Sequence, residues 1–297
     1  MTKIPELLTM LKSGVHFGHQ HAKRHPRMIP YIFTSKSGFH IINLEVTQEK
    51  LKEALDFVKK IVANGGTILF LGTKKQAQPI ITKYAQEVEM PYIIERWLGG
   101  TFTNYLEISR VIKRFTDLKK KRASGELDKY TKKEKLEFDR EIDKLNKMVG
   151  GIEEMSKVPD AVFVCDIKKE KTAVAEAVKK NIPVIAMCDT NVNPEKVNYV
   201  IPANDDAVKS IDLITSLIAE AVSEGLSEKG KIQEIEAIAA EKEEKKAKAE
   251  QAEKAEKDAK AEKDAKAEKE AKAEQAEKNK QTEKAEKETT AKKEEKK

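Results

Sequence analysis

The sequence predicts an α/β fold, in which a doubly wound parallel sheet carries an inserted helical hairpin and a charged low-complexity C-terminal tail. Three observations support this prediction. Short apolar runs alternate with segments of helical periodicity, as in βαβ units. Two highly charged segments with helical spacing interrupt the alternation once. Beyond Ile238 the chain contains no Val, Ile, Leu, Phe, Tyr or Trp, so that region cannot build a hydrophobic core.

The first half of the predicted domain contains three strands and two helices. The predicted strands lie at residues 40–44, 67–72 and 91–95, and the predicted helices at 47–64 and 76–88. In the first helix Leu51, Leu55 and Val58 recur at helical spacing, and Gly65 follows as a stop signal. The strand at 67–72 is apolar almost throughout, which is typical of a strand buried on both faces.

The inserted hairpin occupies residues 105–149. In each half, apolar residues recur every three or four positions, and almost everything between them is charged. Thr131 and Glu134 have the spacing of a capping box that opens the second half. Two narrow apolar seams joined by a polar turn at 122–130 predict an antiparallel coiled-coil hairpin that projects from the domain.

The βαβ alternation resumes after the hairpin. Strands are predicted at residues 159–166, 182–189 and 198–202, and helices at 173–180 and 205–224. Asp166, Asp189 and Asp205 lie at strand ends or helix starts, where an α/β sheet places its ligands. They could hold a divalent cation through oxygen ligands, or they could cap helices. We favour helix capping, and the sequence leaves cation binding open.

Composition and charge divide the chain into three parts. Residues 1–39 form a basic N-terminal arm and lead-in, residues 40–227 the α/β domain, and residues 228–297 a charged tail that is partly helical or disordered. The net charge of +6 belongs mainly to the part that can fold. Cys165 and Cys188 lie in apolar runs, which favours reduced, buried thiols and a cytoplasmic location. We expect no signal peptide and no membrane span.

The loop after the strand at 67–72 is the strongest hint of an enzyme. Its sequence, LFLGTKKQA, has one glycine and no Ser or Thr after the lysines, so it does not match a phosphate-binding P-loop. No dinucleotide-binding glycine motif follows any strand. We therefore expect no cofactor. Lys74 and Lys75 at a helix start suit the phosphates of a polymer instead.

Four of the five histidines fall within residues 14–28. They are His16, His19, His21 and His25, interspersed with Lys23, Arg24 and Arg27. The spacing of His21 and His25 is compatible with zinc, but no paired cysteines accompany them, and a cation would lie among three positive charges. We expect no metal site here, and interpret the segment as an arm that faces RNA.

Further candidate RNA contacts lie downstream of the arm. Residues 96–105 combine a basic side chain with a glycine pair and short hydroxyl and amide groups that suit phosphate and sugar. We interpret Trp97 in this segment as a core residue. The first hairpin helix starts with a basic cluster, part of which is ordinary solvated helix surface. The complete set of predicted RNA-binding residues is Lys23, Arg24, His25, Arg27, Lys36, Lys74, Lys75, Arg96, Thr103, Asn104, Arg110, Lys113 and Arg114.

Nine motifs, in order, resemble one known family. They are GVHFGHQ, HPRM, GFHIINLE, ILFLGTKKQA, RWLGGTFTN, GGIEEM, PDAVFVCD, KNIPVIAMCDTN and VNYVIPANDDA. Together they are similar to the bacterial small-subunit ribosomal protein S2 family over about residues 3–226. The family typically reads HQTRRWNPKM where this chain has HQHAKRHPRM, so His21 and His25 depart from its pattern. A zinc site that needs all four histidines would be peculiar to this chain.

The resemblance implies a Rossmann-like or flavodoxin-like domain with an inserted coiled-coil hairpin. It also implies that the protein is a non-catalytic, structural constituent of the small ribosomal subunit in the cytoplasm. Such a protein would lie between the head and body of the subunit and contact small-subunit ribosomal RNA and neighbouring ribosomal proteins. It would also help to dock ribosomal protein S1. Two alternatives from the residues alone stay open. One is an α/β enzyme that uses a nucleotide or sugar phosphate, with Asp166 and Asp189 as its polar groups. The other is a docking scaffold that recruits a protein through the hairpin or tail.

Overall fold

A five-stranded parallel sheet forms the centre of the protein. The computed structural model describes residues 4–230, apart from the side chain of Asp128. The strands are β4 (Ile68–Leu71), β5 (Tyr92–Ile93), β6 (Ala161–Val164), β7 (Val184–Cys188) and β8 (Tyr199–Pro202). They lie in the order β5-β4-β6-β7-β8, which in chain order is 2-1-3-4-5, the order of one common class of doubly wound sheets. The predicted α/β fold with a parallel sheet is confirmed.

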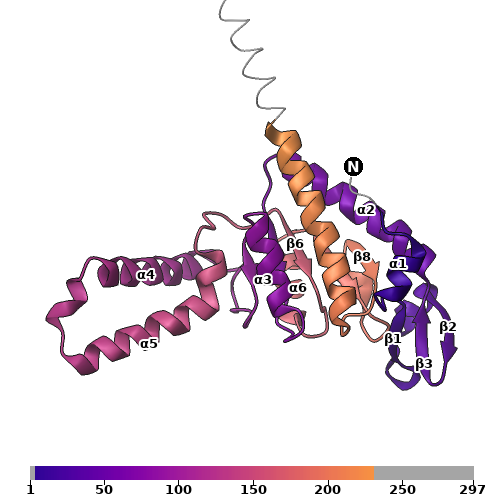
Figure 1. Cartoon of the computed structure of the whole chain (residues 1–297), viewed down its shortest axis with the longest axis horizontal. Helices are drawn as coiled ribbons and strands as arrows, with labels where there is room; N and C mark the ends of the chain where they lie inside the picture. The colour runs from indigo at the N-terminus through magenta and orange to yellow at the C-terminus, as the bar shows by residue number, and fades with distance from the viewer. Residues whose placement is uncertain (1–3, 231–297) are drawn as a thin grey trace, which may run out of the picture. The chain divides into compact units, whose positions relative to one another are not determined.

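Helices cover both faces of this sheet (Figure 1). One face packs on α2 (Leu44–Ala63), α3 (Gln78–Glu87) and the helix at residues 208–230. The other packs on α6 (Lys171–Lys179) and on the base of the hairpin. Along β4, Ile68 and Phe70 face the first layer while Leu69 and Leu71 face the second, and all four are fully buried. Burial on both faces explains why these strands are continuously apolar.

The inserted hairpin consists of α4 (Tyr105–Ala123) and α5 (Lys132–Val149), which pack together and project from the sheet (Figure 1). The predicted capping box is present, because the Thr131 side chain accepts from the Glu134 N–H and the Glu134 carboxylate accepts from the Thr131 N–H. At its root the chain returns onto β5. A Cβ on Gly151 would lie 2.2 Å from the Tyr92 carbonyl oxygen, so no larger residue fits there without movement.

The strand predicted at 40–44 does not belong to the parallel sheet. It forms β3 (Phe39–Ile42), which pairs antiparallel with β1 (Phe17–Gln20) and β2 (Ile32–Lys36) in a separate three-stranded sheet. Its alternating burial is typical of an antiparallel sheet with one face in solvent. Both residues of the β2–β3 turn, Ser37 and Gly38, have positive φ (52° and 81°), as a tight two-residue hairpin requires.

Two predicted helix starts are also shifted. α2 begins at Leu44 rather than near residue 47, because the Asn43 side chain accepts the Glu45 N–H at 3.0 Å and caps the helix. The last helix begins at residue 208 rather than 205. The Asn204 side chain accepts the N–H groups of the next turn, so Asp205 precedes the helix.

The N-terminal lead-in also contains the short helix α1 (Leu7–Lys12) and two 3-10 turns, η1 (His21–Lys23) and η2 (Pro26–Tyr31). The predicted charged tail lies outside the described residues from position 231 onward. None of the helices at residues 4–230 is long and apolar enough to cross a membrane.

Candidate nucleic-acid interface

The carboxyl edge of the parallel sheet gathers most of the predicted RNA-binding residues. Lys74 and Lys75 follow β4, and Arg96 follows β5, so both groups lie at the edge where parallel strands end. The basic N-terminal arm, residues 14–28, reaches the same edge. The His25 N–H donates to the Thr190 carbonyl oxygen at 2.8 Å, just beyond the end of β7. Segments far apart in sequence therefore meet at one edge.

The arm approaches the core closely. A Cβ on Gly18 would lie 2.7 Å from Thr190 Cγ2 and 3.1 Å from the His40 carbonyl oxygen, so glycine permits this contact. Met28 is fully buried in the core that faces α6. Lys23, Arg24 and Arg27 remain exposed. The arm is thus held by apolar, backbone and His19 side-chain contacts, while Lys23, Arg24 and Arg27 lie at the surface.

The four clustered histidines have four different environments. The His16 ring lies 4.0 Å from that of Phe17 and is tilted 38° to it, and the His21 ring lies 4.8 Å from that of His40. His19 Nδ1 is 2.8 Å from Asp189 Oδ2. His25 Nδ1 accepts the Arg27 N–H at 3.2 Å. Because they do not converge, these histidines do not form a zinc tetrad.

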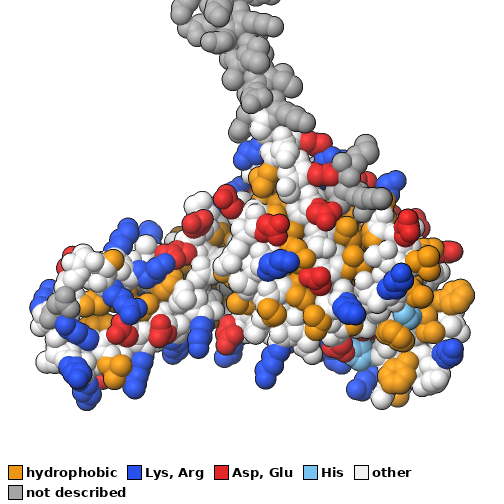
Figure 2. Space-filling model, viewed as in Figure 1, with side chains coloured by type: hydrophobic (Ala, Val, Ile, Leu, Met, Phe, Trp, Pro, Cys, Tyr) orange, Lys and Arg blue, Asp and Glu red, His pale blue; other side chains and the backbone are white. Residues whose placement is uncertain are grey.

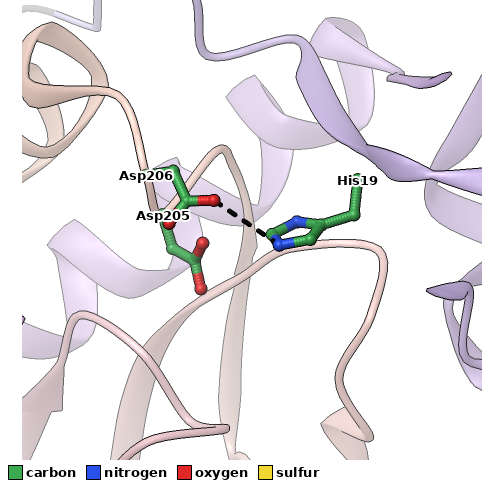
Figure 3. Close-up of side chains that lie close together, drawn as sticks. All are labelled: His19, Asp205 and Asp206. Atoms are coloured by element: carbon green, nitrogen blue, oxygen red, sulfur yellow. Dashed lines mark ion pairs between the residues drawn. The ribbon is translucent and has the colours of Figure 1, made fainter.

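One group of potential ligand atoms does come together in the part of the chain that the structure describes. His19, Asp205 and Asp206 each place one such atom within 4.8 Å of the others, and Figure 3 shows the three side chains facing one another. His19 Nε2 lies 3.5 Å from Asp206 Oδ2. However, Lys74 Nζ lies 2.9 Å from both Asp205 Oδ1 and Asp206 Oδ1. The lysine already supplies the positive charge that a metal ion would bring.

Lys74 is therefore at the centre of an internal charge network that joins the loops after β4, β6 and β8. Its Nζ also lies 3.0 Å from Asp166 Oδ2, and its side chain is only 16% exposed. Burial alone would lower the pKa of Lys74, but Asp205, Asp206 and Asp166 together raise the pKa well above its ordinary value. Burial raises the pKa of Asp205, and the charges of Asp166 and Asp189 raise it further. Unlike its exposed neighbour Lys75, Lys74 has its charge balanced within the protein.

The loop after β4 is also unsuited to a nucleotide phosphate. The buried Glu170 carboxylate accepts the Thr73 N–H at 3.3 Å and the Thr73 hydroxyl. A phosphate-binding loop instead leaves such backbone donors free for its anion. Burial raises the pKa of Glu170. A protein carboxylate thus already accepts from the donors of Thr73 in this loop.

A second buried carboxylate organises the loop after β5. Glu176 on α6 accepts hydrogen bonds from the Gly100, Phe102 and Thr103 N–H groups at 2.8 to 3.2 Å. It also accepts from Trp97 Nε1 at 3.2 Å and from the Thr103 hydroxyl at 3.2 Å. Burial favours the neutral form, but these donors lower the pKa of Glu176. These five hydrogen bonds hold the loop against α6, with the Thr103 hydroxyl turned toward Glu176.

Trp97 is only 8% exposed and packs edge-to-face on Phe102, with ring centroids 4.8 Å apart. The prediction that it belongs to the core is confirmed. Arg96 and Asn104, on either side of this loop, are exposed. Two of the three predicted RNA-binding residues of the segment are thus accessible to a ligand.

The remaining predicted residues lie away from this edge. Lys36 is exposed at the end of β2 in the small sheet. On α4, Arg110 pairs with Glu107 and Arg114 pairs with Glu141, while Lys113 is exposed. The hairpin residues form a separate group, in which opposite charges already pair two of the three cations.

Two features of this surface were not predicted from the sequence. Glu176 carried no local signal, because more than seventy residues separate it from the loop that it organises. Lys168 and Lys171 follow β6 just as Lys74 and Lys75 follow β4. Because residues that follow parallel strands meet at the edge where such sheets bind ligands, the sequence contains the signal for these two lysines as well. Both are exposed.

Comparisons with known proteins agree with the resemblance seen in the motifs. The family model described as ribosomal protein S2 matches residues 10–225. The chain is 50% identical over 232 residues to the small ribosomal subunit protein uS2 of Flavobacterium johnsoniae, and the aligned region covers 78% of this chain and 91% of the relative. It is 49% identical over 237 residues to uS2 of Bifidobacterium longum, covering 78% and 83% of the two chains. It is 47% identical over 231 residues to uS2 of Roseiflexus castenholzii, covering 78% and 88%.

Proposed function

Because the chain belongs to the ribosomal protein S2 family, we propose that it binds small-subunit ribosomal RNA through the carboxyl edge of its sheet, between the head and body of the subunit. As a member of that family it is a structural protein of the small ribosomal subunit and not an enzyme. One observation carries the RNA-binding proposal: Lys23, Arg24, Lys75 and Arg96 come from three separate segments, lie near one edge and are all exposed.

The chemistry of that edge suits a polyanion. Exposed Lys and Arg side chains neutralise phosphates and release counterions, which makes binding strong at low salt and weaker as salt rises. Arg27 is exposed too, although its guanidinium pairs with Glu195 at 2.8 Å, so RNA would compete with that surface pair. Lys74 has a different role in this proposal, because its charge serves the internal network. Its contribution is to position the loop that carries Lys75.

The hairpin provides a second, weaker contact. Arg110, Lys113 and Arg114 lie within two turns of α4, and Glu107 and Glu141 pair with the two arginines. Surface pairs of this kind are exchanged easily for phosphate contacts. Their substitution should therefore weaken RNA binding less than substitution in the arm.

The test is binding of the full chain to transcribed small-subunit ribosomal RNA over a range of salt concentrations. Charge reversal in the arm, Lys23→Glu with Arg24→Glu, should weaken binding at least ten-fold at moderate salt, because two attractive contacts become repulsive. The matched control is Lys52→Glu with Lys60→Glu, which makes the same charge change at exposed positions of α2. Equal losses of RNA binding in the two double variants would mean that net charge alone causes the effect, which would contradict the proposal.

We propose that the small sheet is the docking surface for ribosomal protein S1. Three phenylalanines of this sheet are exposed, Phe17 by 54%, Phe33 by 73% and Phe39 by 46%. Figure 2 shows hydrophobic side chains gathered at the end of the molecule where β1, β2 and β3 lie. Several exposed aromatic side chains on one small sheet are typical of a protein-binding surface.

This docking surface can be tested by capture of purified ribosomal protein S1 on small subunits that contain the variant chain. Phe33→Ser with Phe39→Ser should abolish capture while RNA binding persists. The control is Leu106→Ser with Leu136→Ser, which removes two exposed leucines from the hairpin, 76% and 51% exposed. Loss of capture only in the control would move the docking site to the hairpin.

A further inference from the structure

We propose that a pocket beside the N-terminal arm binds one unpaired nucleotide of the ribosomal RNA. The base would lie in the pocket, and the phosphate would contact the three lysines that line it. The pocket has a volume of about 340 Å³. It lies where the arm meets the loops after β6 and β7, at the carboxyl edge of the sheet. This inference rests on the proposed RNA-binding function and adds a site that the function alone does not require.

The walls of the pocket are strongly basic. Lys168, Lys171 and Lys196 line it together with His25, and no Asp or Glu is among its lining residues. All three lysines are exposed, and none forms an ion pair with another residue at positions 4–230. Glu195 lies next in sequence to Lys196, but its carboxylate pairs with Arg27. These positive charges therefore remain available to an anion, in contrast to that of Lys74.

The floor of the pocket is apolar. Ile167, Val174 and Val192 line it and are 7%, 2% and 4% exposed. A phosphate alone gains nothing from such a floor, whereas the flat face of a nucleobase packs well against apolar side chains. Cations around an apolar floor thus match both halves of a nucleotide.

A polar group at the pocket has no partner within the described structure. The Asn191 Oδ1 atom is buried and accepts no hydrogen bond there. Buried acceptors are nearly always satisfied, and a donor from outside the protein can reach this one when the Asn191 side chain turns toward the pocket that it lines. The N–H groups on the edge of a nucleobase are such donors.

The occupant must be an unpaired nucleotide of the polymer. A base can enter a pocket only when it is unstacked, which occurs in loops, bulges and single strands of RNA. Arg24, an exposed cation of the arm directly before His25 in the chain, would hold a flanking phosphate. The pocket therefore adds base recognition to an edge that otherwise recognises only charge.

The experiment compares three variants of the full chain, each bound to transcribed small-subunit ribosomal RNA. Lys168→Ala with Lys171→Ala removes two wall charges, and Asn191→Leu removes the unpaired acceptor without a large change in volume. The matched control is Lys179→Ala with Lys180→Ala, at the exposed far end of α6. Urea unfolding of each variant verifies that it is folded.

Two readouts distinguish charge from base recognition. The lysine pair should reduce the slope of log Kd against log salt by about 1.4, if both lysines meet single-strand phosphates, while the control leaves the slope unchanged. Asn191→Leu should weaken binding several-fold without changing the slope. Chemical probing with dimethyl sulfate and a carbodiimide should find at least one unpaired base that the wild type protects and Asn191→Leu leaves reactive.

The possible failures are separable. If the wild type does not bind the RNA, or the arm variant matches its control, the proposed function fails. If the arm variant weakens binding but the wall lysines behave like Lys179 and Lys180, the pocket proposal alone is overturned. Weakening by the lysine pair, with Asn191→Leu and base protection unchanged, would also overturn it, because the lysines would then meet phosphates outside the pocket.

Discussion

The loop after β4 and the loop after β6 occupy equivalent places at the edge of the sheet, yet they use their lysines in opposite ways. Lys74 lies among Asp166, Asp205 and Asp206 and is largely buried. Lys168 and Lys171 lie beside a pocket without acidic residues and are exposed. Strand topology therefore determines where a lysine is placed, and the neighbouring carboxylates determine whether its charge stabilises the protein or remains free for a ligand.

The largest expected effect is that of removing the buried ammonium. Lys74→Met should lower the free energy of unfolding by about 3–5 kcal/mol, because it leaves the buried carboxylates of Asp166 and Asp205 without a counter-charge. Urea unfolding at pH 7 measures this loss. The adjacent substitution, Lys75→Met, should leave the urea midpoint unchanged. Similar losses at the two positions would contradict the assignment of Lys74 to an internal network.

The loop after β5 gives the next largest effect. Glu176→Ala should destabilise the protein by about 2–4 kcal/mol, since it leaves buried backbone and indole donors without an acceptor. Glu176→Gln keeps one acceptor oxygen and should lose less. The fluorescence of Trp97, the only tryptophan, should report the rearrangement in the alanine variant. An unaltered spectrum together with full stability would show that Glu176 does not organise the loop.

A smaller effect concerns the contact between the arm and the network. The hydrogen bond to Asp189 raises the pKa of His19 above its ordinary value of 6.5, against the opposing effect of burial and with help from nearby carboxylates. A raised folded-state pKa stabilises the protein fully below pH 6.5, and this stabilisation is lost as pH rises through the folded-state pKa.

His19→Gln should therefore reduce stability by about 1.5 kcal/mol at pH 5.5 and by less at pH 9. The measured quantity is the difference in unfolding free energy between wild type and variant at the two pH values. This comparison removes the contribution of titrating groups that do not interact with His19, whereas Asp205 and Asp206 lie close enough to it to contribute to the difference. A difference that grows as pH rises would contradict the assignment.

The smallest expected effect concerns the exposed lysines after β6. Lys168→Ala with Lys171→Ala should leave the urea midpoint unchanged, because these exposed lysines pair with no carboxylate in the described chain. The salt dependence of RNA binding should change in the same variant. A clear loss of stability would mean that these lysines, like Lys74, serve the fold.

The elements of the parallel sheet could be predicted because their signals are local. Strands such as β4 are buried on both faces and therefore read as continuous apolar runs. The hairpin followed from two seams and one capping box. The membership of β3 could not be predicted, because its alternating pattern specifies a half-exposed strand but not the sheet that it joins.

The candidate site was predictable in location but not in detail. Lys74, Lys75 and Arg96 each follow a predicted parallel strand, which places them at the same edge of the sheet, and they lie at that edge in the structure. Nothing local in the sequence separates the paired Lys74 from the exposed Lys75, because the carboxylates that distinguish them lie about 90 to 130 residues further along the chain. Long-range pairing of this kind becomes visible only in the folded protein.

The contact at the root of the hairpin has a mechanical consequence. Gly151 lies so close to Tyr92 that the backbone at the root of the hairpin contacts β5 directly, in addition to the side-chain packing at the base of the hairpin. A helix of 19 residues such as α4 is about 28 Å long, so a tilt of roughly 5° at the root would displace the tip by about 2.5 Å. A Cβ at position 151 would force the root of the hairpin to move, and the tip would then shift by a larger distance than the root. The position of any contact at the tip therefore depends on glycine at position 151.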